Sequence, residues 1–253
     1  MSRTALLAAV LIAGATVAAP HAAAQDEPPT SWPIAFADEF DGTEVDRGRW
    51  TIHSNAEADN CLGNKGNQQL EWHTWNALSV REGKLVMTAR KDNPQPGYEW
   101  SSALITTAHG CGQGPAQEFQ VREGDYVETR LKLPKEKGFW PSTWTWNGSG
   151  SNEQDTYEYF SDNPFRLYLT NHQGSGGQCV VTSQVDLTLD WHTIGQVLGP
   201  NETVWFLDGK EVCRQGPFTG DGALVLDMFV YSQIPPEVAE GSMEIDHVRV
   251  HRK

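Results

Sequence analysis

The segment 153–158 reads Glu-Gln-Asp-Thr-Tyr-Glu, with three carboxylates and no basic residue. Its threonine and tyrosine, with two more aromatic residues directly after it, favour a β-strand. Alternate side chains of a strand share a face, so Glu153 and Asp155 would point one way and Glu158 the other. One extra residue, a β-bulge, would return Glu158 to the face of Glu153 and Asp155. The segment therefore predicts either a bulged acidic strand or a half-exposed strand of an acidic protein.

Tryptophans directly upstream favour the bulged strand. In the segment 138–146, Gly-Phe-Trp-Pro-Ser-Thr-Trp-Thr-Trp, three tryptophans alternate with small or polar residues. The alternation predicts one aromatic face, although a core strand is the alternative because Trp is highly buried on average. We predict that Trp140 and Trp144 stack on sugar rings, and we assign Trp146 to the core. Retaining glycosidases hold two carboxyl groups roughly 5–5.5 Å apart, so the two segments together predict a sugar-cleaving site.

At these motifs the sequence resembles glycoside hydrolase family 16, which includes laminarinases, lichenases, agarases and carrageenases. The family's bulged pattern Glu-x-Asp-x-x-Glu is matched by Glu153, Asp155 and Glu158, and its Gly-x-Trp-Pro-x-x-Trp by residues 138–144. Weaker matches follow one another in the family's order over about residues 36–252. They are Asp38-Glu39-Phe40 with Gly42, Asn67-Gln68-Gln69-Leu70-Glu71, Gly83-Lys84-Leu85, Arg130-Leu131-Lys132-Leu133-Pro134, Asp190-Trp191-His192-Thr193, Val204-Trp205-Phe206-Leu207-Asp208-Gly209 and Glu244-Ile245-Asp246-His247-Val248-Arg249-Val250.

The resemblance implies a fold and a division of roles. The fold would be all-β, a concanavalin A-like jelly roll of two curved antiparallel sheets with the substrate cleft on the concave face. Glu153 would be the nucleophile, Glu158 the general acid/base, and Asp155 the residue that keeps their charges apart. His172, which follows the acidic strand, would bind sugar in the cleft.

The same resemblance implies further ligands. The amide of Asn67 would meet sugar hydroxyls, and Trp72 beside it would either stack on sugar or belong to the core. A structural calcium ion, which prefers oxygen ligands, would be held by Glu39, the carbonyl of Gly83 and Asp246. Catalysis itself would need no cofactor.

Some positions depart from the family pattern. Gln154 and Thr156 stand where aliphatic side chains usually face the core, and each must find a hydrogen bond or cost ~1–3 kcal/mol. Leu104 stands where β-1,3-glucanases often carry an arginine that binds sugar. The segment 227–234 lacks the Gly-Gly-x-Trp element of laminarinases. These departures leave the carboxylates intact and bear on which substrate is bound.

The start of the chain predicts export. Residues 1–24 combine Arg3, an apolar run and Ala-Ala-Ala before Gln25, which is typical of a cleaved signal peptide and too short for a membrane span. Residues 25–35 read as a polar, Pro-rich leader, and residues 36–253 as one catalytic domain. Cleavage would change the net charge from −14 to −15 by removing Arg3 (−14 − 1). That charge argues against nucleic-acid or membrane partners.

Four cysteines, an even number in an exported chain, predict two disulfides. They are Cys61, Cys111, Cys179 and Cys213, which allow three pairings. We favour Cys61 with Cys111 and Cys179 with Cys213, because each pair joins neighbours along the chain. Their spacing does not suit a structural zinc site.

Short alternating runs with turn signals recur along the chain and predict a β-sandwich. Asp208-Gly209 between two such runs is a strong hairpin signal. The one helix we expect is short, at residues 236–240. Together these features predict a secreted, monomeric, retaining endo-β-glycosidase acting on a polysaccharide, with β-1,3-glucan as the first substrate. A β-galactanase of the same fold and a non-catalytic, lectin-like sugar-binding protein are the alternatives.

Overall fold

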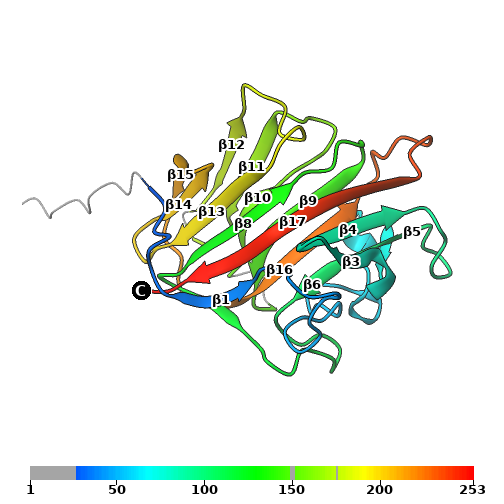
Figure 1. Ribbon diagram of the computed structural model, residues 1–253, viewed down its shortest axis with the longest axis horizontal. Coiled ribbons are helices and arrows are strands. Elements are labelled where there is room, and N and C mark those ends of the chain that lie inside the picture. The colour runs from blue at the N-terminus through cyan, green and yellow to red at the C-terminus, as the bar shows by residue number, and fades with distance from the viewer. Residues whose placement is uncertain (1–26, 149–151, 175) are drawn as a thin grey trace, which may run out of the picture.

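A computed structural model describes residues 27–148, 152–174 and 176–253 (Figure 1), and the segment predicted as a signal peptide lies outside them. The described residues are almost all in strands and loops, apart from the 3-10 helices η1 (Asp59–Cys61), η2 (Lys65–Asn67) and η3 (Trp75–Ala77). No helix among them is long and apolar enough to cross a membrane. The strands are β1 (Ile34–Asp38), β2 (Glu71–His73), β3 (Leu78–Arg81), β4 (Lys84–Arg90), β5 (Trp100–Ser102), β6 (Leu104–Thr106), β7 (Gln120–Arg122), β8 (Tyr126–Lys132), β9 (Phe139–Trp146), β10 (Gln154–Glu158), β11 (Arg166–Asn171), β12 (Gln178–Thr182), β13 (His192–Leu198), β14 (Thr203–Leu207), β15 (Lys210–Gln215), β16 (Asp221–Val230) and β17 (Glu240–His251).

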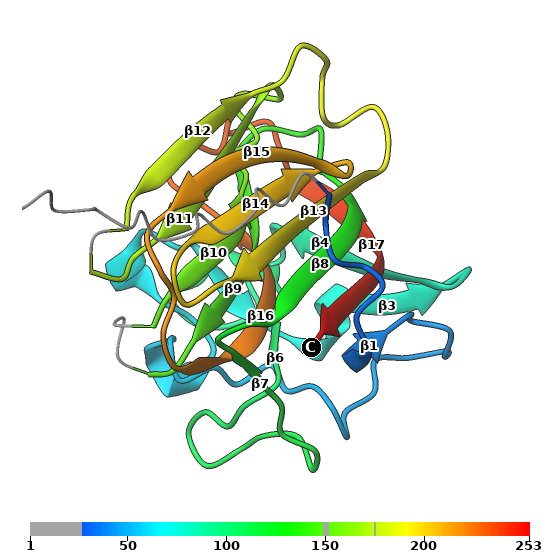
Figure 2. The same ribbon diagram turned by 90° about the vertical axis from the view of Figure 1, so that its left-hand side faces the viewer.

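The strands form two sheets. A ten-stranded sheet has the order β15-β14-β13-β8-β17-β4-β5-β2, with β1 added on β17 and β3 on β4. A seven-stranded sheet has the order β12-β11-β10-β9-β16-β6, with β7 added on β16. The pairs are antiparallel except for β2 with β5. Figures 1 and 2 show strands far apart in sequence, such as β8 and β17, running side by side. The predicted all-β sandwich is confirmed.

The main hydrophobic core lies between the two sheets. Leu131 and Val248 contribute to it from the ten-stranded sheet, and Phe139 and Leu226 from the seven-stranded one. These side chains are 0% exposed, and burying each contributes roughly 1.5–3 kcal/mol. The opposite faces of these strands are therefore free to carry polar groups, which on the seven-stranded sheet form the site described below.

A buried polar chain crosses this core at the two positions that depart from the family pattern. The Thr156 hydroxyl donates to Gln196 Oε1 (2.9 Å), and Gln196 Nε2 donates to Gln154 Oε1 (3.3 Å). Gln154 Nε2 in turn donates to Asn171 Oδ1 (2.6 Å). Gln196 belongs to β13 of the other sheet, so its amide supplies the partners that Gln154 and Thr156 need inside the core.

Turns and boundaries mostly follow the sequence-based expectations. Asp208 and Gly209 connect β14 and β15, and both have positive φ (50° and 78°), as a tight hairpin requires. The helix expected at 236–240 is wrong, because the chain there makes only a turn before β17. Strand β1 begins at Ile34, so it includes the last two residues of the predicted leader.

Both disulfides form in the favoured pairing, with Cα–Cα distances of 5.9 Å for Cys61–Cys111 and 6.2 Å for Cys179–Cys213. Cys179 lies on β12 and Cys213 on β15, which are end strands of the two different sheets. This bond therefore ties the sheets together at one end of the sandwich. The other bond ties the loop at Cys61, beside the cleft, to the loop at Cys111.

Candidate active site

The bulge predicted for the acidic strand is present in β10. Asp155 lies opposite Trp144 of β9, and Glu158 lies opposite Ser142, with a register shift between them. Tyr157, inside the bulge, lies in the core. Glu158 is the third residue after Asp155, an odd offset that would place the two acids on opposite faces of a regular strand, but the extra residue of the bulge gives them the same face. Asp155 and Glu158 therefore point into the cleft, and Glu153, just before the strand, joins them there.

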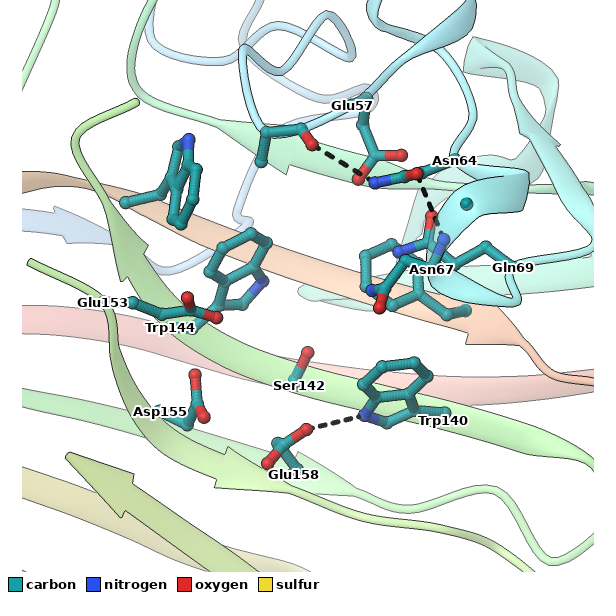
Figure 3. A pocket seen from close by; sticks show the side chains of 14 residues that line it. Glu57, Asn64, Asn67, Gln69, Trp140, Ser142, Trp144, Glu153, Asp155 and Glu158 are labelled. Atoms are coloured by element: carbon teal, nitrogen blue, oxygen red, sulfur yellow. Dashed lines mark hydrogen bonds between the residues drawn. The ribbon is translucent and has the colours of Figure 1, made fainter. Parts of the chain in front are cut away.

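The cleft has a volume of about 350 Å³ and has two polar walls over an aromatic floor (Figure 3). One wall carries Glu153, Asp155 and Glu158. The other comes from the loops around η1 and η2. The residues that line the cleft are Ala56, Glu57, Asn64, Gly66, Asn67, Gln69, Trp140, Ser142, Trp144, Trp146, Glu153, Asp155, Glu158 and Phe229.

The aromatic floor also positions an acid. The indole Nε1–H of Trp140 donates to Glu158 Oε1 (3.1 Å), and its ring stacks on Phe160 with ring centroids 5.0 Å apart. The assignment of Trp146 to the core is corrected, because this side chain is half-buried and lines the cleft. The alternation of β9 explains the correction, since Trp140, Trp144 and Trp146 all share one face.

A buried acid holds the floor from below. Asp227 of β16 accepts hydrogen bonds on Oδ2 from Trp144 Nε1 (2.6 Å) and from the Ser142 hydroxyl (2.7 Å). Its complete burial raises its pKa well above the usual range of a carboxyl group. The sequence analysis missed this role, although a lone acid within the apolar run Leu-Val-Leu-Asp-Met-Phe-Val was a usable signal.

His172 supplies a positive charge beside the three acids. Its Nε2 lies 2.9 Å from Asp155 Oδ2 and 3.9 Å from Glu153 Oε1. The hydrogen bond to Asp155 raises the pKa of His172 to about 9, so the ring is protonated at neutral pH. Among the described residues, Glu153, Asp155 and His172 are close enough together to hold a metal ion. In this structure His172 and Asp155 form an ion pair.

The two glutamates have raised pKa values. Burial, followed by the nearby charge of Asp155, raises the pKa of Glu153 to about 7 and that of Glu158 to about 8. His172 opposes both increases. Glu158, with the higher pKa, is the group more readily protonated at neutral pH. The pair can therefore provide one carboxylate and one carboxylic acid at the same pH.

The wall facing the acids contains one residue that the sequence analysis had placed in the cleft and several that it missed. Asn67 lines the cleft as expected, together with Glu57, Asn64 and Gln69. These residues come from irregular loops, where no alternation marks which side chains share a face. Trp72 is not among the residues that line the cleft, and its ring packs edge-on against Tyr98, with centroids 5.2 Å apart. Stacking of Trp72 on sugar is therefore not proposed.

Apolar packing lies beneath the floor at the position where glucanases often have an arginine. Leu104 is 0% exposed and packs with Trp144, Val225 and Phe229. It pairs with Asp227 across β6 and β16. A side chain there supports the tryptophan from behind and offers sugar no hydrogen bond.

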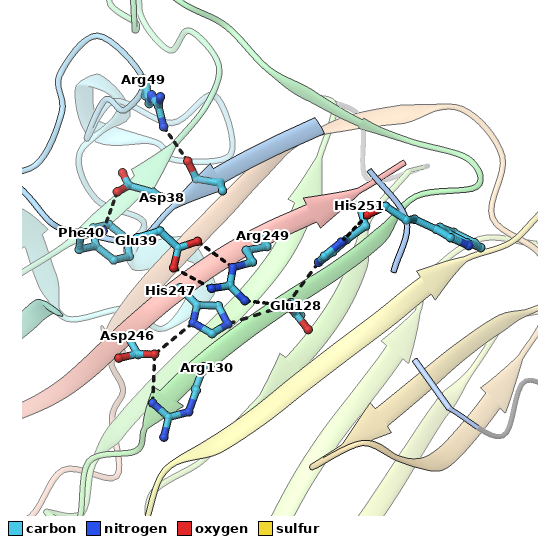
Figure 4. A network of polar contacts seen from close by, with 12 residues as sticks. Asp38, Glu39, Phe40, Arg49, Glu128, Arg130, Asp246, His247, Arg249 and His251 are labelled. Carbon is cyan, nitrogen blue, oxygen red and sulfur yellow. Dashed lines mark hydrogen bonds and ion pairs between the residues drawn. The ribbon is translucent and has the colours of Figure 1, made fainter. Parts of the chain in front are cut away.

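Two of the three residues expected to bind calcium, Glu39 and Asp246, are paired with cationic groups on the outer face of the ten-stranded sheet (Figure 4). Arg249 donates to both carboxylate oxygens of Glu39 (2.7 and 2.8 Å). Arg130 lies 3.0 Å from Asp246 Oδ2, and His247 Nδ1 lies 3.1 Å from the same oxygen. Both carboxylates are thus engaged by cationic groups, and further positive charge would be repelled. As arranged, these residues do not fit a calcium ion.

Comparisons with known proteins agree with this geometry. No model of a known protein family matches the chain. It is 27% identical to endo-1,3-1,4-beta-glycanase EglC of Rhizobium meliloti over 59% of this chain and 34% of that protein. It is 28% identical to glucan endo-1,3-beta-glucosidase of Cryptopygus antarcticus over 71% of this chain and 68% of that protein. The chain thus spans about a third of the first relative's length and two thirds of the second's.

Solved structures give the same picture. An endo-beta-1,3-glucanase from Pyrococcus furiosus superposes with a TM-score of 0.74 at 26% identity, over 87% of this chain and 94% of that one. A non-specific endo-beta-1,3(4)-glucanase from family GH16 superposes with a TM-score of 0.75 at 23% identity, over 90% of this chain and 98% of that one. The chain is thus similar in sequence to endo-β-glucanases and similar in fold to an enzyme of glycoside hydrolase family 16. The bulged Glu-x-Asp-x-x-Glu strand, which resembles the pattern of that family, lines the cleft.

Proposed function

We propose that the protein is a secreted, monomeric, retaining endo-β-glycosidase that cleaves a β-linked polysaccharide, with β-1,3-glucan as its first substrate. The observation that carries the proposal is the bulge that turns Asp155 and Glu158 to one face of β10, beside Glu153 and above a tryptophan floor. Relatives named as 1,3-β-glucanases support the choice of glucan. The two disulfides support an exported protein.

In the first step, the carboxylate of Glu153 attacks the anomeric carbon while protonated Glu158 gives its proton to the departing glycosidic oxygen. The raised pKa of Glu158 favours that proton at neutral pH. Asp155, hydrogen-bonded to His172, lies between the two and separates their charges. In the second step, Glu158 takes a proton from water, which releases the sugar from Glu153 with its β configuration retained.

A β-galactan such as agar is the second candidate substrate. Buried Leu104 and the absence of Gly-Gly-x-Trp at 227–234 both depart from β-1,3-glucanases and favour this alternative. A lectin-like protein would not need two glutamates with raised pKa values across a bulge, so binding alone is disfavoured.

The test is a reducing-end assay on laminarin, lichenan, agarose and carrageenan, with the anomer of the first product followed by NMR. We expect the largest rate on laminarin and a β-anomer that forms before mutarotation. An α-anomer formed first would exclude double displacement. Binding without hydrolysis of any of the four would favour the lectin-like reading.

A further inference from the structure

Unpaired acceptor atoms lie in the wall that faces the catalytic acids. Glu57 Oε2 and Gln69 Oε1 are buried and have no hydrogen-bond partner among the described residues. The Gln69 side chain lies near enough to the Glu57 carboxyl group to lower its pKa, although burial outweighs this effect. Both residues line the cleft, and they are only 8% and 1% exposed. Buried polar atoms are nearly always satisfied, so these two acceptors require an explanation.

Negative charge around Glu57 makes a second acidic site distinct from the catalytic wall. Glu71 lies near enough to raise the pKa of Glu57, and His73 lies near enough to lower it. Burial raises the pKa of Glu57 to about 7. None of the described residues that line the cleft is Lys or Arg. A ligand at this wall must therefore bring hydrogen-bond donors, and it cannot bring negative charge without repulsion.

We infer that Glu57 and Gln69 form a specificity site that accepts hydrogen bonds from the free hydroxyls of an uncharged glycan and excludes sulfated or carboxylated polysaccharides. The inference rests on the proposed function. It narrows the substrate to neutral chains such as β-1,3-glucan or agarose and removes carrageenan-type chains. Glu57 lies across the cleft from Glu153, Asp155 and Glu158 (Figure 3), where it would contact a bound chain without taking part in bond cleavage.

Binding is measured by calorimetry with Glu158→Ala protein, so that turnover does not interfere. The probes are a β-1,3-glucan oligosaccharide and its hydroxyethyl and carboxymethyl derivatives with equal substitution. Hydroxyethyl groups add bulk without charge, so the carboxymethyl-to-hydroxyethyl ratio of Kd isolates the effect of charge. We expect a ratio of at least about ten that falls with added salt.

Adding Glu57→Gln to this protein should weaken binding of the unmodified oligosaccharide roughly tenfold, the scale of one hydrogen bond to a charged group. It should also reduce the carboxymethyl-to-hydroxyethyl ratio. Gln69→Glu, which adds charge at the same wall, should increase that ratio and serves as the second variant if Glu57→Gln fails to fold. The matched control is Glu123→Gln, an exposed acid outside the cleft lining, which should change neither quantity.

Unchanged Kd values in both Glu57→Gln and Gln69→Glu would overturn the inference. Equal affinity for the carboxymethyl and hydroxyethyl forms would also overturn it. The protein with Glu158 intact tests the proposed function separately. If it binds neutral glucan and shows the expected carboxymethyl-to-hydroxyethyl ratio of Kd but releases no reducing ends, only the proposed hydrolysis is refuted.

Discussion

Carboxylates gather on both faces of the sandwich, but their partners differ. On the outer face of the ten-stranded sheet, Glu39 is held by Arg249, and Asp246 by Arg130 and His247 (Figure 4). Beside the cleft, His172 contacts two of the three acids, Asp155 at 2.9 Å and Glu153 at 3.9 Å. One cluster is matched in charge, and the other has an excess of negative charge.

The pKa values follow this difference. The hydrogen bond from Arg249 lowers the pKa of Glu39, and the bonds from Arg130 and His247 outweigh burial in lowering that of Asp246. Burial raises the pKa values of Glu153 and Glu158. The same residue type is thus kept ionised on one face and able to exchange protons near neutral pH on the other. Excess buried charge of one sign is costly for stability and is typical of a catalytic site.

The largest expected effect comes from removing the catalytic acids. Glu153→Ala should abolish hydrolysis. Glu158→Ala should lose about 10²–10⁴-fold in rate on polysaccharide, where the leaving group needs a proton. It should still perform the first step on an aryl glycoside, and azide should then speed turnover and yield a β-glycosyl azide. Product analysis by NMR checks this. Azide rescue of Glu153→Ala alone, or an α-azide from Glu158→Ala, would mean that the roles are reversed.

The cation in the cleft should control the pH profile. The reaction needs ionised Glu153 and protonated Glu158, so kcat/KM should fall below a pH of about 7 and above about 8. His172⁺ lowers both pKa values, so His172→Gln should shift both limbs to higher pH and reduce activity most on the acid side. The control is His109→Gln, an exposed histidine paired with Glu118. An unshifted pH profile in His172→Gln would mean that the charge of His172 does not affect the pKa values of Glu153 and Glu158.

On the outer face, loss of a cation should affect stability and leave the reaction unchanged. Arg249→Met removes the partner of Glu39 and a neighbour, at 3.6 Å, of nearly buried Glu128. Because Glu39 is partly exposed, we expect a loss of only about 1–3 kcal/mol. Thermal melts should show a decrease in Tm of a few degrees at unchanged kcat. Arg90→Met, which breaks the exposed pair with Glu240, is the matched control and should cost less. A changed kcat in Arg249→Met would mean that the ion pair on the outer face affects the reaction in the cleft.

The smallest expected effect is that of calcium. Because Arg249 and Arg130 already pair with the acids, added calcium or a chelator should leave Tm unchanged within the error of a melting curve. A bound ion would stabilise the fold by mass action. The contrary result is that calcium raises Tm in the parent protein and not in Asp246→Asn. That result would show that calcium displaces the arginines from these carboxylates.

Local pattern, together with the family resemblance, predicted the bulged acidic strand. The spacing of Glu153, Asp155 and Glu158 required a bulge to share a face, and the bulge is there. The two cysteine pairs were likewise predicted as neighbours along the chain. The bulge depends on the fixed period of a strand, and each disulfide joins cysteines that are neighbours along the chain. The order of residues was therefore enough to propose both.

Features that need partners distant in sequence could not be predicted in this way. The opposite wall, with Glu57 and Gln69, comes from loops without a period. Gln154 is satisfied by Gln196, 42 residues away, in the other sheet.

The sequence by itself determined the all-β class, the bulged acidic strand and the aromatic face of β9, because side chains alternate strictly along a strand. Only the tertiary structure decided which charges are compensated. Glu39 and Arg249 lie 210 residues apart, and Asp227 and Trp144 lie 83 apart. Charge interactions and burial act through space, so the packing of the two sheets sets the pKa values and separates the structural acids from the catalytic ones.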